Sequence, residues 1–319
     1  MGLGVGLVGA VALAIRYCWQ RATRQPLPDF ISPAIFATRV VSTSRGEIVY
    51  HVSGSGEPMI FLHGIYPGAS SFEWSRVYPE FAVGHEVIAP DLIGFGESER
   101  PRLGLDADDH VQSLADLCHA IVPGRPATIV ASGFGAAIAL KLAVQHPELV
   151  QRLILFAPVG LDANVRRIPL GMATLSRLPV LNRFVYRNYF ARRPFLRGWV
   201  NRFGFADGSR AGDDIIDVLT SFASQYGAEH AMLAFLRGRL LYDVKSQLPR
   251  VTQKVSVLWP DRPDHFPSDL ARRLERDLRI CRIVPAGRIG MLGALEAPQT
   301  LRELIDTELD DRVWISGAA

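Results

Sequence analysis

The sequence predicts an α/β protein with a doubly wound, mostly parallel sheet and an inserted helical segment. Three observations support this fold class. Short apolar runs alternate with helical patterns along most of the chain, as in a mostly parallel sheet. Residues 161–250 interrupt that alternation with helical, arginine-rich sequence. The chain has 319 residues, 48% of them hydrophobic and 21% charged, which is enough for a sizeable core and excludes disorder.

The predicted strands are short apolar runs bounded by turn residues. In chain order they are 37–42 and 46–54 (an opening hairpin), 59–63, 85–90, 127–131, 151–158, 254–260 and 281–287. Helical spacing is found at 107–121 and 135–146, and residues 296–309 are predicted to form a closing helix. The sheet is therefore expected to have eight strands.

The first fifteen residues, MGLGVGLVGAVALAI, carry no charge, and three arginines follow by residue 24. As a helix, residues 2–15 would span about 21 Å, short of the ~30 Å hydrocarbon core. Adding the next few residues, with Arg16 snorkelling, makes spanning feasible. We expect a membrane anchor at 1–19 and a linker at 20–35, with the main domain on the cytoplasmic side by the positive-inside rule. The alternative is a hydrophobic helix packed on the domain.

Charge and cysteine content narrow the possible partners. The net charge of +3 is too small for a chain of this size to indicate nucleic-acid binding. Cys18, Cys118 and Cys281 are widely spaced and form neither a disulfide framework nor a metal-binding pattern. We expect no metal and no cofactor.

Four motifs resemble the α/β-hydrolase superfamily, in its single-sheet, cap-bearing branch. They are FLHGIYPGASSFEW, VIAPDLIGFGESERP, the segment that begins VASGFG, and LEAP. The resemblance implies a core formed by 36–160 and 251–310, with a helical cap at 161–250. It also implies a scaffold role for the turn residues Asp91, Gly94, Gly96 and Ser98.

The resemblance implies a nucleophile on a sharp strand-to-helix turn, followed in the chain by an acid and a histidine. Aligned on that pattern, the turn is Ala131 to Gly135, and the nucleophile position is occupied by Gly133. Glycine tolerates the backbone strain of such a turn but supplies no chemical group. Ser132 is one residue too early, and its hydroxyl is expected to point away from the pocket mouth and to bond locally.

The acid and histidine positions are also altered. The usual acid pattern after the seventh strand coincides with Pro263, so Asp264 is the nearest candidate and Asp261 lies on the other side. The histidine position, five residues before the LEAP glutamate, is Met291. His265 is a weak alternative base, and no histidine follows it in the chain.

The oxyanion loop is retained in the sequence. His63 and Gly64 with Ile65 match its motif, and the backbone N–H of Phe134 occupies the place of the second donor. His63 itself is expected to be structural. Losing a triad nucleophile or base typically lowers kcat about 10⁶-fold, so ordinary triad hydrolysis is expected to be absent.

The leading hypothesis is therefore a membrane-associated, triad-deficient α/β-hydrolase-fold protein, a pseudoenzyme that binds an apolar or lipid-like ligand or a protein partner. The alternative is an active hydrolase of the esterase, lipase or epoxide-hydrolase kind with a rearranged site that uses Asp264, His265 or a bound water. A lyase or dioxygenase-like activity stays open but needs the same missing histidine.

The predicted cap carries a separate signal. Between residues 163 and 206 there are nine arginines and no lysine, aspartate or glutamate, and aromatic residues are interleaved with them. Such a stretch is typical of a membrane-surface element. The alternative is a solvated face paired with acidic residues elsewhere, namely Asp207, Asp213, Asp214 and Asp217.

Overall fold

The computed structural model describes residues 32–33, 35–102, 104–160, 174, 178–240 and 244–315. The predicted anchor at 1–19 and most of the predicted linker lie outside these residues. Within the described ranges, no helix combines the length and the hydropathy needed to cross a membrane.

The strands form one eight-stranded sheet with the order β1-β2-β4-β3-β5-β6-β7-β8. β1 and β2 form an antiparallel hairpin, β2 is antiparallel to β4, and all other neighbours are parallel. The predicted eight-stranded, mostly parallel sheet is confirmed. The strands are β1 (Ala37–Thr43), β2 (Gly46–Ser53), β3 (Glu57–Leu62), β4 (His85–Pro90), β5 (Ala127–Ser132), β6 (Val150–Phe156), β7 (Lys254–Pro260) and β8 (Cys281–Gly287).

The central strands are buried along nearly their whole length. All six residues of β5 are buried, as are the last six of β7. Strands covered by helices on both faces need continuous apolar runs, which explains sequences such as MIFL and KVSVLWP. The edge strand β1 shows mostly exposed positions instead.

Helices between the strands cover the sheet. α2 (Ala107–Ile121) packs against α3 (Gly133–Gln145) and the β1–β2 hairpin, whereas α9 (Ser268–Asp277) and α11 (Pro298–Leu309) pack against β8. The start of α2 is fixed by a capping box, in which Asp106 and Asp109 each accept the other's backbone N–H.

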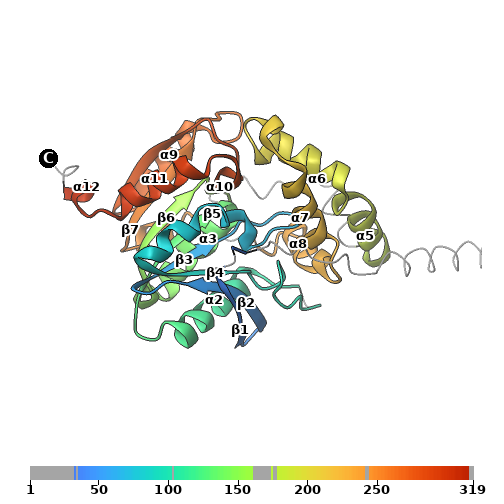
Figure 1. Cartoon of the computed structure of the whole chain (residues 1–319), viewed down its shortest axis with the longest axis horizontal. Coiled ribbons are helices and arrows are strands. Elements are labelled where there is room, and N and C mark those ends of the chain that lie inside the picture. The colour runs from blue at the N-terminus through green and yellow to red at the C-terminus, as the bar shows by residue number, and fades with distance from the viewer. Residues whose placement is uncertain are drawn as a thin grey trace, which may run out of the picture.

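A helical insert lies between β6 and β7. Its described helices are α5 (Pro179–Val185), α6 (Arg193–Trp199), α7 (Asp213–Ala223) and α8 (Ala228–Leu236). Figure 1 shows these four helices gathered at one end of the molecule, to one side of the sheet. A π-helical segment, Tyr186–Phe190, continues α5. The exact boundaries of core and cap remain predictions.

Candidate active site

The turn between β5 and α3 has the geometry of a strained strand-to-helix elbow. Gly133 has a φ of 51°, in the left-handed region, whereas Ser132 before it is extended. Only glycine adopts that φ without strain. A Cβ added at Gly133 would lie 3.6 Å from Gly64 Cα and 3.9 Å from a Val159 methyl group, which are ordinary contact distances. The turn therefore accommodates a methyl-sized group at position 133 without a steric clash.

Gly135 explains why the turn sits so close to the oxyanion loop. A Cβ at Gly135 would lie 2.4 Å from the carbonyl oxygen of His63. Only a residue without a side chain lets the start of α3 approach the end of β3 this closely. The small residues of the elbow thus set the distance between the two halves of the site.

A carboxyl group that sequence analysis did not identify lies beside this turn. Glu73, in the 3-10 turn Ser71–Trp74, is 2% exposed and accepts a hydrogen bond from the Ser132 hydroxyl through Oε1. Its Oε2 accepts the backbone N–H of Gly64 at 2.9 Å and the Tyr66 hydroxyl at 2.9 Å. The expected local hydrogen bond of Ser132 is therefore wrong: its hydroxyl turns toward the oxyanion loop and binds a residue 59 positions away.

Burial controls the protonation of this carboxyl group. It raises the pKa of Glu73 to about 7, even though the hydrogen bonds from Ser132, Gly64 and Tyr66 favour the ionised form. The pKa of Tyr66 is also raised, mainly by burial and then by the neighbouring Glu73, so its hydroxyl stays a donor. Near neutral pH, Glu73 is thus present in both protonation states.

His63 is held in a neutral, structural form. Its Nε2 accepts the backbone N–H of Leu92 at 2.9 Å, so Nδ1 carries the proton and donates to the Gly64 carbonyl at 2.7 Å. Burial lowers its pKa, which agrees with a neutral ring. With both ring nitrogens engaged, His63 fastens the oxyanion loop to the turn after β4.

The backbone N–H groups of Gly64 and Phe134, the candidate oxyanion donors, differ in their hydrogen-bond partners. The Gly64 N–H is already used by Glu73. The N–H of Phe134 belongs to the first turn of α3, where backbone donors have no acceptor within the helix. Phe134 and Ile65 are both buried beside the elbow. The indole of Trp199, at the end of α6, stacks on Tyr66 with ring centroids 5.0 Å apart, so the insert contacts this site.

The other predicted site residues lie in the loops after β7 and β8. Asp264 is exposed and His265 partly exposed, and both line a surface groove with Arg202 and Arg262. The His265 ring contacts Phe203 edge to face at 5.2 Å. All eight histidines lie in the described part of the chain, and none of them hydrogen-bonds Glu73 or Ser132 there.

Met291 is partly buried, and its loop is tied to the insert. The Met291 N–H donates to the Phe203 carbonyl at 3.0 Å. Glu296, of the LEAP motif, accepts backbone N–H groups from Ala206, Asp207 and Gly290 at 2.7–2.9 Å. This loop is therefore built to fasten the insert to the core.

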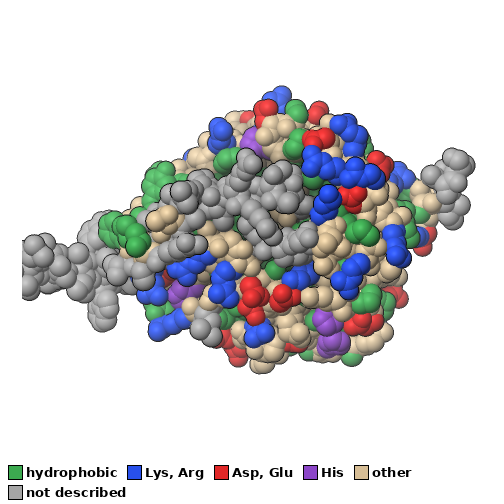
Figure 2. Space-filling view, turned by 180° about the vertical axis from the view of Figure 1, so that it is seen from behind, with side chains coloured by type: hydrophobic (Ala, Val, Ile, Leu, Met, Phe, Trp, Pro, Cys, Tyr) green, Lys and Arg blue, Asp and Glu red, His purple; other side chains and the backbone are tan. Residues whose placement is uncertain are grey.

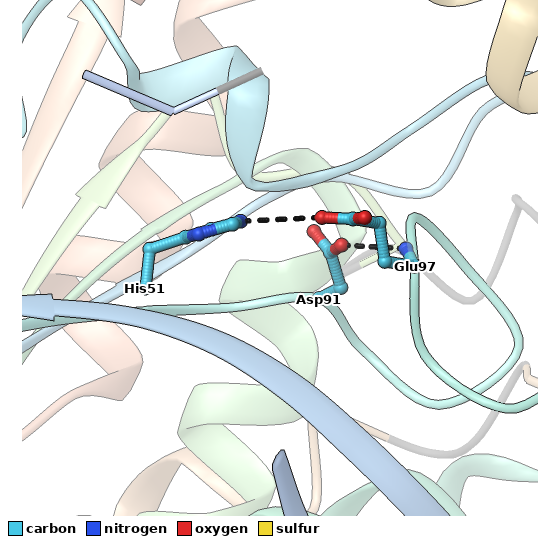
Figure 3. Close-up of side chains that lie close together, drawn as sticks. All are labelled: His51, Asp91 and Glu97. Carbon is cyan, nitrogen blue, oxygen red and sulfur yellow. Dashed lines mark hydrogen bonds and ion pairs between the residues drawn. The ribbon is translucent and has the colours of Figure 1, made fainter. Parts of the chain in front are cut away.

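A second cluster of titratable groups joins His51 of β2 to Asp91 and Glu97 in the turn after β4 (Figure 3). The Asp91 oxygens accept the backbone N–H groups of Ser71 at 2.6 Å and Glu97 at 2.7 Å, and a Cβ at Gly96 would overlap the Asp91 carboxyl group. His51 Nε2 is 3.8 Å from a Glu97 oxygen. Because both Asp91 oxygens already hold backbone amides, we assign the cluster to the scaffold of the turn.

These features define an α/β-hydrolase-fold protein: an eight-stranded sheet, an elbow after β5, an oxyanion loop after β3 and a helical insert after β6. In agreement, residues 57–203 match the family model described as alpha/beta hydrolase fold.

Among curated relatives, the chain is similar to a 2-hydroxymuconate semialdehyde hydrolase of Pseudomonas sp. strain CF600, with 40% identity over 35% of this chain and 40% of the relative. It is also similar to a 2-hydroxy-6-oxo-6-(2'-aminophenyl)hexa-2,4-dienoic acid hydrolase of Metapseudomonas resinovorans, with 27% identity over 71% of this chain and 73% of the relative. The chain thus spans less than half the length of the first of these relatives.

Among solved structures, a serine hydrolase involved in carbazole degradation superimposes with a TM-score of 0.71 at 22% identity, covering 86% of this chain and 98% of that one. This likeness concerns the fold.

Proposed function

We propose that this chain is a hydrolase with a rearranged site, in which Glu73 is the acid–base group and Ser132 relays protons to it. The observation that carries the proposal is the hydrogen bond from the Ser132 hydroxyl to Glu73 beside the elbow. The proposal corresponds to the alternative of an active hydrolase that uses a bound water, with Glu73 in place of Asp264 or His265.

The proposed chemistry places the substrate carbonyl beside Gly133. A substrate carbonyl held there would direct its oxygen to the N–H groups of Phe134 and Ile65. A water molecule attacks the carbonyl carbon and gives one proton to the Ser132 oxygen, while Ser132 passes its own proton to the Glu73 carboxylate. The protonated Glu73 then returns a proton through Ser132 to the leaving group. No covalent intermediate forms, and all protons are accounted for.

The protonation state of Glu73 suits this role. A general base works best when its pKa lies near the working pH, and the pKa of Glu73 is about 7. General acid–base assistance contributes typically about 10²–10⁴-fold. We therefore propose turnover well below that of a complete triad but measurable above background.

The relatives guide the choice of substrate. Their names specify 2-hydroxymuconate semialdehyde and a 2-hydroxy-6-oxo-dienoic acid, which are unsaturated acids that carry a carbonyl group. We propose small carbonyl compounds of this class and short acyl esters as the first substrates to test.

The test measures hydrolysis of p-nitrophenyl acetate and of a 2-hydroxy-6-oxo-dienoic acid by the full chain. Glu73→Gln and Ser132→Ala are each expected to lower the rate about 10²-fold or more. The chain offers a matched control in a second buried Ser–Glu pair. Ser256, on strand β7 and away from the elbow, donates to the buried Glu308 of α11 at 2.7 Å. Ser256→Ala and Glu308→Gln should keep the activity of the folded protein.

A fluorophosphonate probe distinguishes two routes. The proton relay predicts no covalent adduct. An adduct on Ser132 would show instead that the Ser132 hydroxyl attacks the substrate as a nucleophile. Hydrolysis that is equal in wild type and Glu73→Gln would contradict both.

A second candidate function is the binding of an apolar or lipid-like ligand, or of a partner, without hydrolysis. The absence of a side chain at Gly133 and the methionine at position 291 favour it. Fatty-acid binding by a chain that hydrolyses none of these substrates would support this function over the first.

A further inference from the structure

An exposed apolar surface is formed by the residue before α5, by α5 itself and by the π-helical segment that follows it. Leu178, Leu181, Phe184 and Tyr189 are 48%, 45%, 49% and 60% exposed. We call these four residues the α5 surface. Figure 2 shows hydrophobic side chains gathered at the edge of the molecule on which α5 lies.

This concentration is unusual for the described part of the chain. Nine large hydrophobic side chains are exposed there, and four of them fall within these twelve residues. Single exposed apolar residues are common, but a group of large ones marks an interaction site. Leu178 is the N-cap residue before α5, and Leu181 and Phe184, three residues apart, lie on the same side of that helix.

The neighbouring arginines divide into two groups. Arg187 is 2.7 Å from the buried Glu229, Arg193 is 2.7 Å from Asp213, and Arg197 also pairs with Asp213. Of the four expected acidic partners, Asp213 and Asp217 pair with these arginines, whereas Asp214 pairs with Arg76.

Arg183 and Arg192 form the second group. Within the described residues, no carboxylate lies at ion-pair distance from either of them. Arg183 is exposed and lies between Leu181 and Phe184 in the chain. Half-exposed apolar residues flanked by uncompensated cations are complementary to the boundary between acyl chains and phosphate groups.

We propose that the α5 surface docks on a bilayer that contains anionic lipids. Leu181 and Phe184 enter the acyl boundary, and Arg183 and Arg192 contact lipid phosphates. The uncharged residues 2–15, followed by three arginines, favour the same kind of surface independently. The proposal does not depend on hydrolysis.

Hydrogen exchange of the full chain tests it with three samples: no vesicles, phosphatidylcholine vesicles, and phosphatidylcholine mixed with phosphatidylglycerol. Peptides covering 178–190 should become protected with the anionic vesicles alone. Leu181→Asp/Phe184→Asp should abolish that protection. The control Val83→Asp/Ile280→Asp changes two hydrophobic residues exposed elsewhere and should leave it intact.

A pair of charge-reversal variants measures how much the arginines contribute to vesicle binding. Arg183→Glu/Arg192→Glu should weaken binding to anionic vesicles about tenfold or more, whereas Arg272→Glu/Arg279→Glu, two other exposed arginines, should change it much less.

Two results would overturn the proposal. Protection that persists in Leu181→Asp/Phe184→Asp would place the membrane contact elsewhere. Equal protection of 178–190 without vesicles would mean that another part of the chain covers the α5 surface.

Discussion

The two sides of the candidate site differ in how their polar groups are held. On the side of β3 and β5, Glu73, Ser132 and Tyr66 are buried and joined by hydrogen bonds. On the side of β7 and β8, Asp264 is exposed, and Met291 is held through its backbone. The buried, hydrogen-bonded polar side chains of the candidate site are therefore concentrated on the first side.

The difference teaches that the two sides of one site can bury polar groups to very different extents. A carboxyl group buried without a cation is costly, so it is kept only where its hydrogen bonds are made. Glu73 has three neutral donors and no cationic partner among the described residues. Glu308, by contrast, has Arg282 at 3.2 Å. The two buried Ser–Glu pairs therefore differ in charge compensation, which makes the second a control for the first.

The largest effect on folding is expected at the contact between the elbow and the oxyanion loop. Gly135→Ala places a Cβ 2.4 Å from the His63 carbonyl oxygen and should cost about 3 kcal/mol or more. Urea unfolding measures it. The control is Gly198→Ala in α6, where nothing lies within 4 Å and alanine should stabilise by about 0.5–1 kcal/mol. A stabilised Gly135→Ala variant would refute the close approach.

The next largest effect is expected on the pH dependence of the free energy of unfolding. Glu73 has a pKa of about 7 in the folded chain and 4.5 as a model group, so the folded state binds more protons between these values. The contribution of Glu73 to the free energy of unfolding is therefore complete below about pH 4.5. It falls by about 3 kcal/mol as the pH rises to 7.

Glu73→Gln should remove this loss. In that variant, the buried His110 should act in the opposite direction, since burial lowers its pKa to about 4, so stability should rise between pH 4 and 6.5. Urea unfolding from pH 4 to 8 compares the variant with wild type. Parallel curves would show that the pKa of Glu73 is the same in the folded and unfolded states.

Much of the fold was accessible from the sequence, but only part of the site. The apolar runs of β3 to β7 predict strands because parallel strands are buried on both faces. Gly133 was accessible because its pattern is local. Glu73 was missed because its partner Ser132 is 59 residues away and a 3-10 turn has no hydrophobic period. The one available signal was an acidic residue between the aromatic residues Phe72 and Trp74.

A smaller effect is expected at the elbow residue itself. Gly133→Ala keeps ordinary contact distances but forces a side chain onto a φ of 51°, which should cost about 1–2 kcal/mol. Urea unfolding measures it, with Gly198→Ala again as the reference. A neutral effect would indicate that the turn relaxes out of the left-handed region.

The smallest effect is expected on the side of β7. Asp264→Ala should change the free energy of unfolding by less than about 0.5 kcal/mol, because the Asp264 side chain is exposed. It should also leave hydrolysis unchanged, because the proposed proton path runs through Ser132 and Glu73. Urea unfolding and the ester assay, run together with Glu73→Gln, measure both. If Asp264→Ala abolished hydrolysis while Glu73→Gln kept it, the acid–base group would belong to the loop after β7, and the contrast between the two sides would be reversed.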